Sequence, residues 1–400
     1  MKNYFFNPEI FVEEKIIFDK FFFNKDIKKN YSAIKSKVEN KSVLIIGGAG
    51  TIGSAYTVEI LKFNPSKIYV IDKNENSLTE LTRFLRSSGR INKKTYFMTY
   101  PIDFASNVFK KMFIHNKGFD IIANFAAHKH VRSEKDAFSI EAMIENNIIG
   151  TVKLIDLMKK FKPQNFFSVS TDKASKPVNI MGASKKIMEN IILSNKNNFR
   201  VSTARFANVA FSNGSLLDGF IFRFKNNQPL SCPSDIKRFF VSKRQSGQIC
   251  LLSTFMGESG DIFFPKFDFY KDQILFKDIT LKLIDYLGMK AKIFTNEKKA
   301  LKNNCEFPYY PIFFFNSNTS GEKKYEEFYS TNDTVCLENY SSLGIIKNSY
   351  KRTSAKLLLD DFRQLFLKSD VNKQSIIKLI KKYVEDFEHI ETGNSLDQKM

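Results

Sequence analysis

The sequence predicts an α/β protein, with a doubly wound parallel sheet and a smaller C-terminal α/β lobe. Short apolar, β-branched runs alternate with helical patterns from residue 41 onward. A glycine-rich turn follows the first run, and polar or small residues stand where later runs end. This alternation is typical of parallel strands covered by helices on both faces. With 400 residues, 43% of them hydrophobic, the chain can bury a sizeable core.

Residues 1–40 are expected to form an N-terminal helical arm. The stretch EIFVEEKIIFDKFFF mixes Phe and Ile with charged residues, as an amphipathic helix does. Such an arm can attach the protein to a membrane surface or a partner, or pack on the main domain or on a second subunit. We favour packing, because apolar stripes usually face a core. We expect neither a signal peptide nor a membrane-spanning segment.

The stretch SVLIIGGAGTIGSAYTVEILK reads as a buried strand, a tight turn and a helix. Its turn carries Gly47, Gly50 and Gly53, with Thr51 and Ile52 between the last two glycines. Glycines at a helix N-terminus let backbone N–H groups approach a pyrophosphate, and the helix dipole favours the negative charge. This pattern predicts a Rossmann-type dinucleotide site.

The next two strands each end in a carboxylate. KIYVIDKNENSL ends its strand at Asp72, about 20 residues beyond the glycines, where a carboxylate can accept hydrogen bonds from a ribose. It would repel a 2′-phosphate, so NAD is favoured over NADP. The alternative is that Asp72 only caps a turn. YFMTYPIDF places Asp103 at the end of the following strand, where it can meet the adenine amine.

The fourth strand, in FDIIANFAAHKHV, ends in small residues. Ala126 and Ala127 allow the backbone close to a cofactor. His128 and His130 flank Lys129 in a spacing that can bind metal, but no further His or Cys lies near in sequence. We therefore expect no metal site.

The fifth strand, QNFFSVS, leads into STDKASKPVNIMGASK. Thr171, Asp172 and Lys173 stand at its end, and Met181 and Lys185 follow. Because ligands of such sheets bind at the carboxyl ends of the strands, we expect these side chains to face the cofactor. The alternatives are a surface ion pair for Asp172 and Lys173, and core packing for Met181.

The regular alternation of strand and helix patterns changes near residue 213. FRVSTARFANV reads as a sixth strand, and pieces such as GDIFFPKFDF and PIFFFNSN then alternate with helices. We expect a Rossmann domain over residues 41–212 and a substrate-binding lobe over 213–345, interleaved with it. Residues 346–400 read as two amphipathic helices, which can pack on the lobe or contact another subunit.

Charge and cysteine content narrow the function classes. Lys and Arg number 62 and Asp and Glu 42, a net charge of +20, but the basic residues are spread along the chain. We interpret the positive charge as attracting a phosphorylated substrate, which is a simpler interpretation than nucleic-acid binding. The four cysteines form no CxxC pair, which suits a reducing cytoplasm and predicts neither zinc nor disulfides.

Several motifs together resemble the extended short-chain dehydrogenase/reductase superfamily, and within it the polysaccharide-biosynthesis branch of nucleotide-sugar dehydratases and epimerases. The resemblance spans about residues 41–327. The motifs that carry it are GGAGTIG, NFAAHKHV, STDKASKPVNIMGASK, RFANVAFSNGSLLDGF, DIKRFFVS and SGEKKYEEF. It implies bound NAD, a UDP-sugar substrate, a homo-oligomer, and a UDP-N-acetylglucosamine 4,6-dehydratase-like activity.

Two positions depart from this pattern. Most of the superfamily has YxxxK, whereas this chain has Met181 with Lys185. By resemblance the Met favours a dehydratase that retains the C5 configuration. Thr319 and Ser320 replace the Arg and Pro that normally precede GEK, which leaves the nucleotide and the sugar open.

The resemblance implies a cycle in which the sugar C4 gives hydride to NAD, water leaves across C5 and C6, and the hydride returns to C6. Since a thioether cannot act as a base, proton transfer falls to Thr171, Asp172 and Lys173. We expect Lys173 to be the base that removes the C5 proton, with a lowered pKa. We expect Asp172 to be the acid that protonates the C6 hydroxyl, with a raised pKa. A direct ion pair between them would oppose both pKa shifts, so the alternatives are that the two share one proton or that their roles are swapped. Thr171 would bind O4, and Lys185 the nicotinamide ribose.

The candidate substrate ligands come from several motifs. We expect Lys129 and His130 near the sugar, Asn208 and Ser215 near the diphosphate or sugar, and Arg238 near the phosphates. Glu322 is expected to organise its loop. The leading hypothesis is dehydration; the alternatives are a C4 or C5 epimerase on the same scaffold and a non-catalytic NAD-binding scaffold protein.

Overall fold

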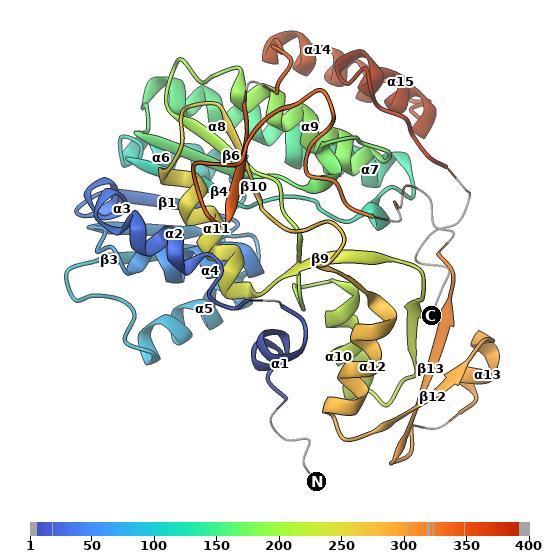
Figure 1. The fold of residues 1–400 in the computed structure, drawn as a ribbon. Helices are drawn as coiled ribbons and strands as arrows, with labels where there is room; N and C mark the ends of the chain where they lie inside the picture. The colour runs from blue at the N-terminus through green and yellow to red at the C-terminus, as the bar shows by residue number, and fades with distance from the viewer. Residues whose placement is uncertain are drawn as a thin grey trace.

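The computed structural model describes residues 6–17, 19–303, 305–317, 321, 323, 325–347 and 349–391. Its largest sheet has nine strands in the described chain, in the order β14-β15-β10-β6-β5-β4-β1-β2-β3 (Figure 1). The bounds of these strands are β1 Ser42–Ile46, β2 Lys67–Ile71, β3 Tyr96–Tyr100, β4 Ile121–Asn124, β5 Asn165–Val169, β6 Val201–Ala204, β10 Asp261–Pro265, β14 Thr334–Cys336 and β15 Leu343–Lys347.

Seven of these strands, from β3 to β10, run parallel. β1, β4 and β5 are buried apolar runs, as strands covered on both faces must be. The strand order reverses at β1, which pairs with β2 on one side and β4 on the other. Such a reversal opens a crevice at the carboxyl edge of a sheet. The fold class predicted from the sequence is confirmed.

Helices cover both faces of this sheet. α4 and α11 pack together on one face, while α6, α8 and α9 form the layer on the other (Figure 1). A π-helix, Glu145–Ile149, lies between α7 and α8. The helix bounds are α4 Thr51–Leu61, α5 Glu75–Ser87, α6 Asn107–His115, α7 Ala137–Ile144, α8 Gly150–Lys160, α9 Ile180–Leu193 and α11 Lys243–Phe255.

The main sheet extends further along the sequence than predicted. GDIFFPKFDF was expected in the smaller lobe, but its strand β10 pairs parallel with β6 in the main sheet. β15 then adds antiparallel to β10, and β14 antiparallel to β15. The placement of this strand in the lobe was therefore wrong. Its completely buried residues fit a central position, since neighbours cover it on both edges.

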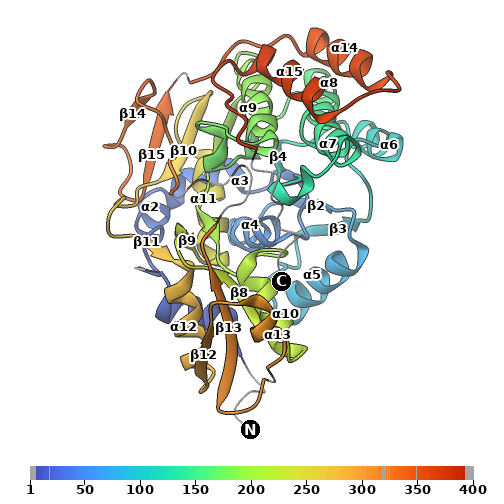
Figure 2. The same ribbon diagram turned by 90° about the vertical axis from the view of Figure 1, so that its right-hand side faces the viewer.

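The smaller lobe lies below the main sheet in Figure 2. It holds a parallel sheet, β12-β13-β8, and a second small sheet, β11-β9-β7. Its helices surround a separate apolar cluster that includes Leu217, Phe220 and Ile312. The bounds are β7 Asn208–Val209, α10 Leu216–Lys225, β8 Leu230–Pro233, β9 Lys237–Val241, β11 Gln273–Leu275, α12 Phe276–Tyr286, β12 Lys290–Phe294, α13 Glu297–Leu301 and β13 Tyr309–Phe315.

The described part of the N-terminal arm contains three short helices: α1 Pro8–Lys15, α2 Asn24–Lys29 and α3 Tyr31–Val38. α1 packs on α12 of the lobe, and α2 packs on α11 of the main domain. Asp26, on α2, is buried and accepts hydrogen bonds at 2.6–3.0 Å from the backbone and hydroxyl groups of Ser341 and Ser342. The arm therefore packs on both parts of the same chain, as the favoured interpretation expected.

The C-terminal segment forms α14, Ala355–Phe366, and α15, Lys373–Tyr383. The two helices confirm the sequence pattern, but α15 packs on α7 and α9 of the main domain rather than on the lobe (Figure 2). Beyond α15, the N–H groups of Glu388 and Ile390 donate to the carbonyls of Pro177 and Val178. The tail is thereby paired with the segment that carries Thr171 and Lys185.

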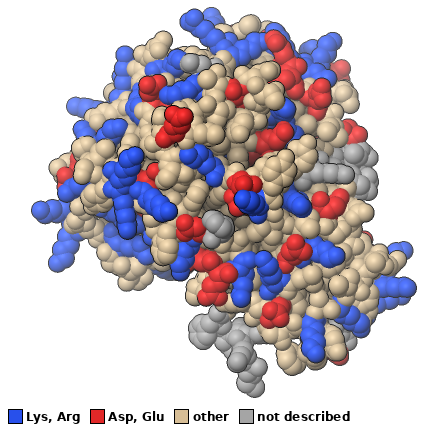
Figure 3. All heavy atoms as spheres, in the orientation of Figure 1, with Lys and Arg blue, Asp and Glu red and all other residues tan. Residues whose placement is uncertain are grey.

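Figure 3 shows Lys and Arg side chains spread over the whole of one face, with Asp and Glu among them. Within the described residues, no helix combines the length and apolarity needed to cross a membrane.

Candidate active site

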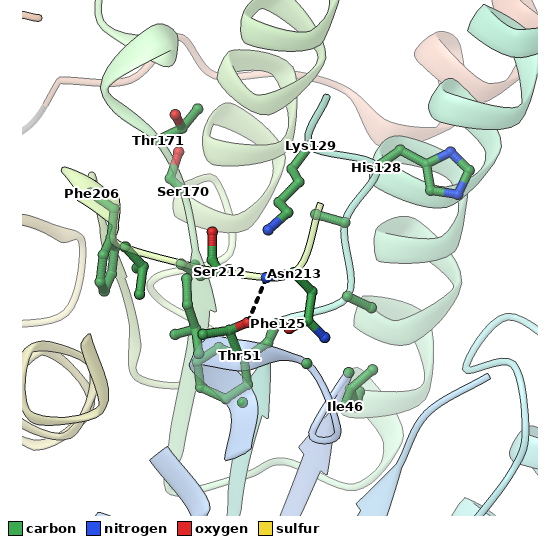
Figure 4. A pocket seen from close by; sticks show the side chains of 18 of the residues that line it. Ile46, Thr51, Phe125, His128, Lys129, Ser170, Thr171, Phe206, Ser212 and Asn213 are labelled. Atoms are coloured by element: carbon green, nitrogen blue, oxygen red, sulfur yellow. Dashed lines mark hydrogen bonds between the residues drawn. The ribbon is translucent and has the colours of Figure 1, made fainter. Parts of the chain in front are cut away.

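A cavity of ≈ 410 Å³ lies at the carboxyl edge of the parallel strands (Figure 4). It is bounded by the glycine turn after β1, by the ends of β2, β4 and β5, and by the segment between β6 and α10. Its lining includes most of the residues predicted from the sequence, which are Gly47, Gly50, Thr51, Ile52, Gly53, Asp72, Ala126, Ala127, Lys129, Thr171, Asp172, Lys173, Met181, Lys185 and Asn208.

The glycine turn brings the backbone of α4 against the end of β4. Gly47 has φ +69°, and a Cβ there would lie 2.5 Å from the backbone nitrogen of Ala126. A Cβ on Gly53 would lie 2.3 Å from the carbonyl oxygen of Gly47. At Gly50 the nearest atom would be an ordinary 3.5 Å away. Two of the three glycines are thus required by close packing, and the turn leaves the N-terminus of α4 open to the cavity, an arrangement whose dipole favours an anion.

The carboxylates after β2 and β3 differ in their placement. Asp72 lies in the cavity and accepts the N–H groups of Ala49 at 3.1 Å and Asn74 at 3.0 Å. It therefore caps the glycine turn and also lies where a ribose would sit. Asp103 pairs with Lys73 at 2.8 Å, and although burial raises its pKa, that pairing and the N–H of Ala105 make the net shift downward. Asp103 is outside the cavity lining, so its adenine contact stays a prediction.

The turn after β4 is held by a buried asparagine on the π-helix. The Asn147 amide accepts the N–H of His128 at 2.9 Å and donates to its carbonyl at 3.0 Å. It also donates to the Ser184 hydroxyl on α9 at 3.0 Å. These bonds aim Lys129 into the cavity, as Figure 4 shows. The scarcity of solvent there lowers the pKa of Lys129, and Asp218 opposes that shift.

Thr171, Asp172 and Lys173 follow β5 directly, at the cavity wall. The Thr171 hydroxyl donates to Asp172 Oδ1 at 2.8 Å, and Lys173 Nζ lies 3.3 Å from both carboxylate oxygens. Asp172 is buried, whereas Lys173 stays partly exposed. The hydroxyl, carboxylate and amine therefore form one hydrogen-bonded chain that can pass a proton along it.

Helix α9 carries Met181 and Lys185 into the same cavity. Lys185 is buried and donates to the carbonyl of Val169 at 2.7 Å. Burial lowers its pKa to about 8, against the opposing effect of Glu189. Met181 is 2% exposed and belongs to the main core as well as to the cavity lining. The thioether therefore both packs in the core and lines the cavity.

The N-terminus of α9 is capped by two side chains. Asn179 accepts the N–H of Gly182 at 2.7 Å, and the buried Glu134 accepts those of Ile180 at 3.0 Å and Met181 at 2.8 Å. An acidic cap at a helix N-terminus is favoured by the helix dipole as well as by the hydrogen bonds. This pair fixes the start of the helix that presents Lys185.

A fully buried ion pair links the strands and the helix whose residues line the cavity. Arg205, after β6, binds Glu189 of α9 through two contacts of 3.1 and 2.9 Å and donates to the carbonyl of Phe328 at 2.8 Å. Ser170 donates to Glu189 at 2.6 Å. Burial raises the pKa of Glu189, but Arg205 outweighs it and the net shift is downward. The pair therefore stays charged and joins β5, β6 and α9 behind the site.

A second carboxyl, which the sequence had not singled out, adjoins the cavity. Glu326 is buried; it accepts the Asn208 amide at 2.6 Å and the N–H of Phe239 at 3.0 Å, and lies 3.7 Å from Arg238. Burial and the nearby Asp172 raise its pKa to about 7, against the effects of Lys173, Arg238 and that N–H. Only its place in GEKKYEEF could have signalled it, and that motif offers several glutamates alike.

The remaining predicted ligands lie at the margin. Ser215 caps α10 by accepting the N–H of Asp218 at 3.3 Å. Arg238 is buried and donates to the carbonyl of Lys323 at 2.9 Å, outside the cavity lining. A Cβ on Gly214 would lie 3.0 Å from His130 Nε2. Their substrate contacts stay predictions.

Glu322, Thr319 and Ser320 lie outside the described residues. No group of three or more His, Cys, Asp or Glu that could hold a metal occurs in the described part of the chain.

Relatives with known sequences share much of this chain. An uncharacterized membrane protein of Methanocaldococcus jannaschii is 28% identical over 79% of this chain and 88% of its own length. The capsular polysaccharide biosynthesis protein CapD of Staphylococcus aureus is 26% identical over 87% of this chain, which spans only 55% of CapD. The inverting UDP-N-acetylglucosamine 4,6-dehydratase of Campylobacter jejuni is 27% identical over 56% of this chain and 67% of its own length.

Solved structures share the fold. Pen from Bacillus thuringiensis superposes with a TM-score of 0.63 at 22% identity, covering 86% of this chain and 98% of Pen. A UDP-glucuronic acid 4-epimerase from Bacillus cereus, solved with UDP-glucuronic acid and NAD, gives 0.53 at 20% identity over 71% and 89%. The sequence family described as "Polysaccharide biosynthesis protein" matches residues 43–348, and the chain therefore belongs to that family.

Proposed function

We propose that this protein is an NAD-dependent nucleotide-sugar 4,6-dehydratase, converting UDP-N-acetylglucosamine to a UDP-4-keto-6-deoxy-N-acetylhexosamine. One observation carries the proposal. The cavity beside the dinucleotide turn holds an acid–base chain of Thr171, Asp172 and Lys173, and Met181 where a tyrosine would be the base. Oxidation at C4 alone needs one proton acceptor. Removing water across C5 and C6 needs a further acid and base, which the hydrogen-bonded Asp172 and Lys173 supply.

The cofactor is NAD. Gly47 and Gly53 give the backbone approach that its pyrophosphate needs, and Asp72 lies at the end of β2, where a carboxylate binds a ribose and repels a 2′-phosphate. Lys185 lines the same cavity, and we assign it to the nicotinamide ribose. Bound there, NAD supplies the acceptor and later the donor of the hydride exchanged with the sugar.

Protein groups handle the protons. Thr171 holds the sugar O4 and passes its proton to Asp172, to which it is already hydrogen bonded. Lys185, when charged, stabilises the developing negative charge on that oxygen. Lys173 then removes the C5 proton, and Asp172 protonates the departing C6 hydroxyl. Because Lys173 and Asp172 contact each other directly, they act as a coupled pair that exchanges one proton.

A C4 epimerase is the second candidate. The similarity to the UDP-glucuronic acid 4-epimerase structure favours it, because epimerisation uses the same cofactor site and only the proton on O4. Epimerisation at C4 leaves Lys173 without a role, whereas dehydration uses Thr171, Asp172 and Lys173 alike.

Product analysis separates the two. We expect the protein, incubated with UDP-N-acetylglucosamine, to give a nucleotide sugar lighter by one water in mass spectrometry. An unchanged mass with an inverted C4 in the NMR spectrum would establish the epimerase instead. NMR of the dehydrated product also reports whether C5 is retained, as Met181 leads us to expect. Parallel incubations with other UDP- and dTDP-sugars identify the preferred substrate.

A further inference from the structure

Glu326 is a buried carboxyl for which the mechanism above has no task. It lies in the loop after β13, and every other group in contact with it comes from a different element. Asn208 of β7 donates to one carboxylate oxygen at 2.6 Å, and the N–H of Phe239 on β9 donates to the other at 3.0 Å. Arg238, also on β9, lies 3.7 Å from the first oxygen. The carboxyl is therefore held in one position from three sides.

Glu326 also connects two cavities. Its partner Asn208 lines the active-site cavity with Asp172 and Lys173. Glu326 itself lines a second cavity, of ≈ 490 Å³, together with Glu327. The carboxyl therefore holds a residue of the active-site wall, and it lies close enough to Asp172 and Lys173 for their charges to act on it.

We propose that Glu326 is a positioning residue of the dehydration, which fixes Asn208 in the cavity wall and stores a proton for the Asp172–Lys173 pair. This role rests on the proposed function. Over one cycle the sugar releases a proton from O4 and one from C5, and it receives one on the departing C6 hydroxyl and one back at C5. The hydride that leaves C4 returns to C6. Protons and electrons balance if the O4 proton stays in the site until the C6 hydroxyl receives it, and Glu326 is a second carboxyl that can share this proton with Asp172.

The surroundings of Glu326 suit that store. Burial and Asp172 raise its pKa, whereas Lys173, Arg238 and the N–H of Phe239 lower it, and the Asn208 amide also donates to it. The protonated form of Glu326 is therefore favoured up to near neutral pH. The proton is lost as the pH rises through about 7.

The test compares Glu326→Gln with Glu327→Gln. Glu327 is the next residue and pairs with Lys323 at 3.7 Å, whereas the Asn208 amide donates to Glu326. We expect wild-type kcat to fall as the pH rises through about 7. Glu326→Gln should lower kcat at pH 6 by roughly 10-fold or more and remove this step in the pH profile, since the amide cannot titrate. Glu327→Gln should keep both rate and profile. An unchanged profile in Glu326→Gln would overturn the proposal.

A measurement without substrate separates this inference from the proposed function. A carboxyl whose pKa is raised by folding stabilises the protein fully below its ordinary value of 4.5 and loses that stabilisation as the pH rises to about 7. The melting temperature of wild type should therefore drop by a few degrees relative to Glu326→Gln between pH 4.5 and 8. If the temperatures separate but no sugar loses water, the proposed function fails and the catalytic role falls with it. If wild type is active and the temperatures do not separate, only the inference fails.

Should Glu326→Gln not fold, Glu326→Asp keeps a titratable group and should keep a pH step with a shifted midpoint. A wild-type profile with no step between pH 6 and 8 would overturn the proposal without any variant.

Discussion

Lys185 shows at the scale of one residue how function opposes stability. Its amine is buried and its pKa is lowered from 10.5 to about 8. A lysine whose pKa is lowered by folding costs stability at every pH below about 10.5, its ordinary pKa, because the folded state binds the proton more weakly. The cost is complete below about 8 and disappears as the pH rises between these values. A shift of this size corresponds to about 3 kcal/mol at pH 7.

Lys185→Met should therefore stabilise the protein at neutral pH. Removing the amine abolishes the cost of about 3 kcal/mol, while losing the 2.7 Å bond to Val169 costs about 1 kcal/mol. We expect a net gain of about 2 kcal/mol at pH 7 that becomes a small loss near pH 10, measured by urea unfolding. Turnover should fall by 10²-fold or more. A variant that is less stable at pH 7 than at pH 10, relative to wild type, would contradict this.

Substitutions of Lys173 and Met181 should have opposite effects on kcat. Lys173→Ala removes the base, so kcat should fall by about 10²–10⁴-fold with the bound NAD content unchanged. Met181→Leu replaces a thioether that holds no transferable proton by a side chain of similar volume, so kcat should stay within about threefold. Steady-state rates and the NAD content of the purified variants check both. A wild-type rate in Lys173→Ala would refute the assigned base.

Single residues also show how far the sequence could predict the site. Asp72 and the group Thr171–Lys173 were predictable, because each follows a buried strand and so must lie at its carboxyl edge. Glu326 was not. In GEKKYEEF nothing local distinguishes a buried glutamate from an exposed one, and its partners Asn208 and Phe239 are distant in sequence. Such contacts appear only once the chain is folded.

The turn from β1 to α4 can be tested by comparing its Gly47 with Gly89, a glycine that follows α5. Gly47 and Gly89 both have positive φ, +69° and +64°, so Ala strains the backbone at either position. Only at Gly47 would the Cβ strike another segment, 2.5 Å from Ala126, whereas nothing lies within 4 Å of one at Gly89. Gly47→Ala should abolish NAD binding in calorimetry. Gly89→Ala should bind NAD normally, with a melting temperature only slightly lowered.

The elements themselves were predictable to different degrees. The central parallel strands read as apolar runs because helices bury them on both faces, and their order follows from the helical crossovers between them. β10 reads the same way, but its sequence neighbours belong to the lobe, so position along the chain misplaced it. β14 is only three residues, one exposed and two partly buried, and carries no such signal.

At the scale of the whole molecule, Asp26 joins the N-terminal arm to the segment before β15. Burial raises the pKa of this carboxyl, but the bonds from Ser341 and Ser342 outweigh it and the net shift is downward. A lowered pKa stabilises the fold above the ordinary value of 3.8, and the contribution is lost as the pH falls below it.

Asp26→Ala leaves the donors of Ser341 and Ser342 without their acceptor, at a cost of about 3 kcal/mol. The arm should become sensitive to limited proteolysis at neutral pH, while NAD binding is retained. Asp19→Ala is the matched control, because that side chain accepts one bond in an exposed turn of the same arm and should cost less than about 1 kcal/mol. Equal protease resistance of wild type and Asp26→Ala would show that the arm is held elsewhere.

The pairing of Glu388 and Ile390 with Pro177 and Val178 sets an order of events during synthesis. A ribosome that has made the first half of the chain has made five of the seven parallel strands, β1 to β5, and such units generally begin to fold as they emerge. The carbonyls of Pro177 and Val178, in the segment that also carries Thr171, still lack their backbone donors at that stage. These two bonds form only after residues 388–390 have left the ribosome, so this support of the segment is completed after nearly all of the described chain has been translated.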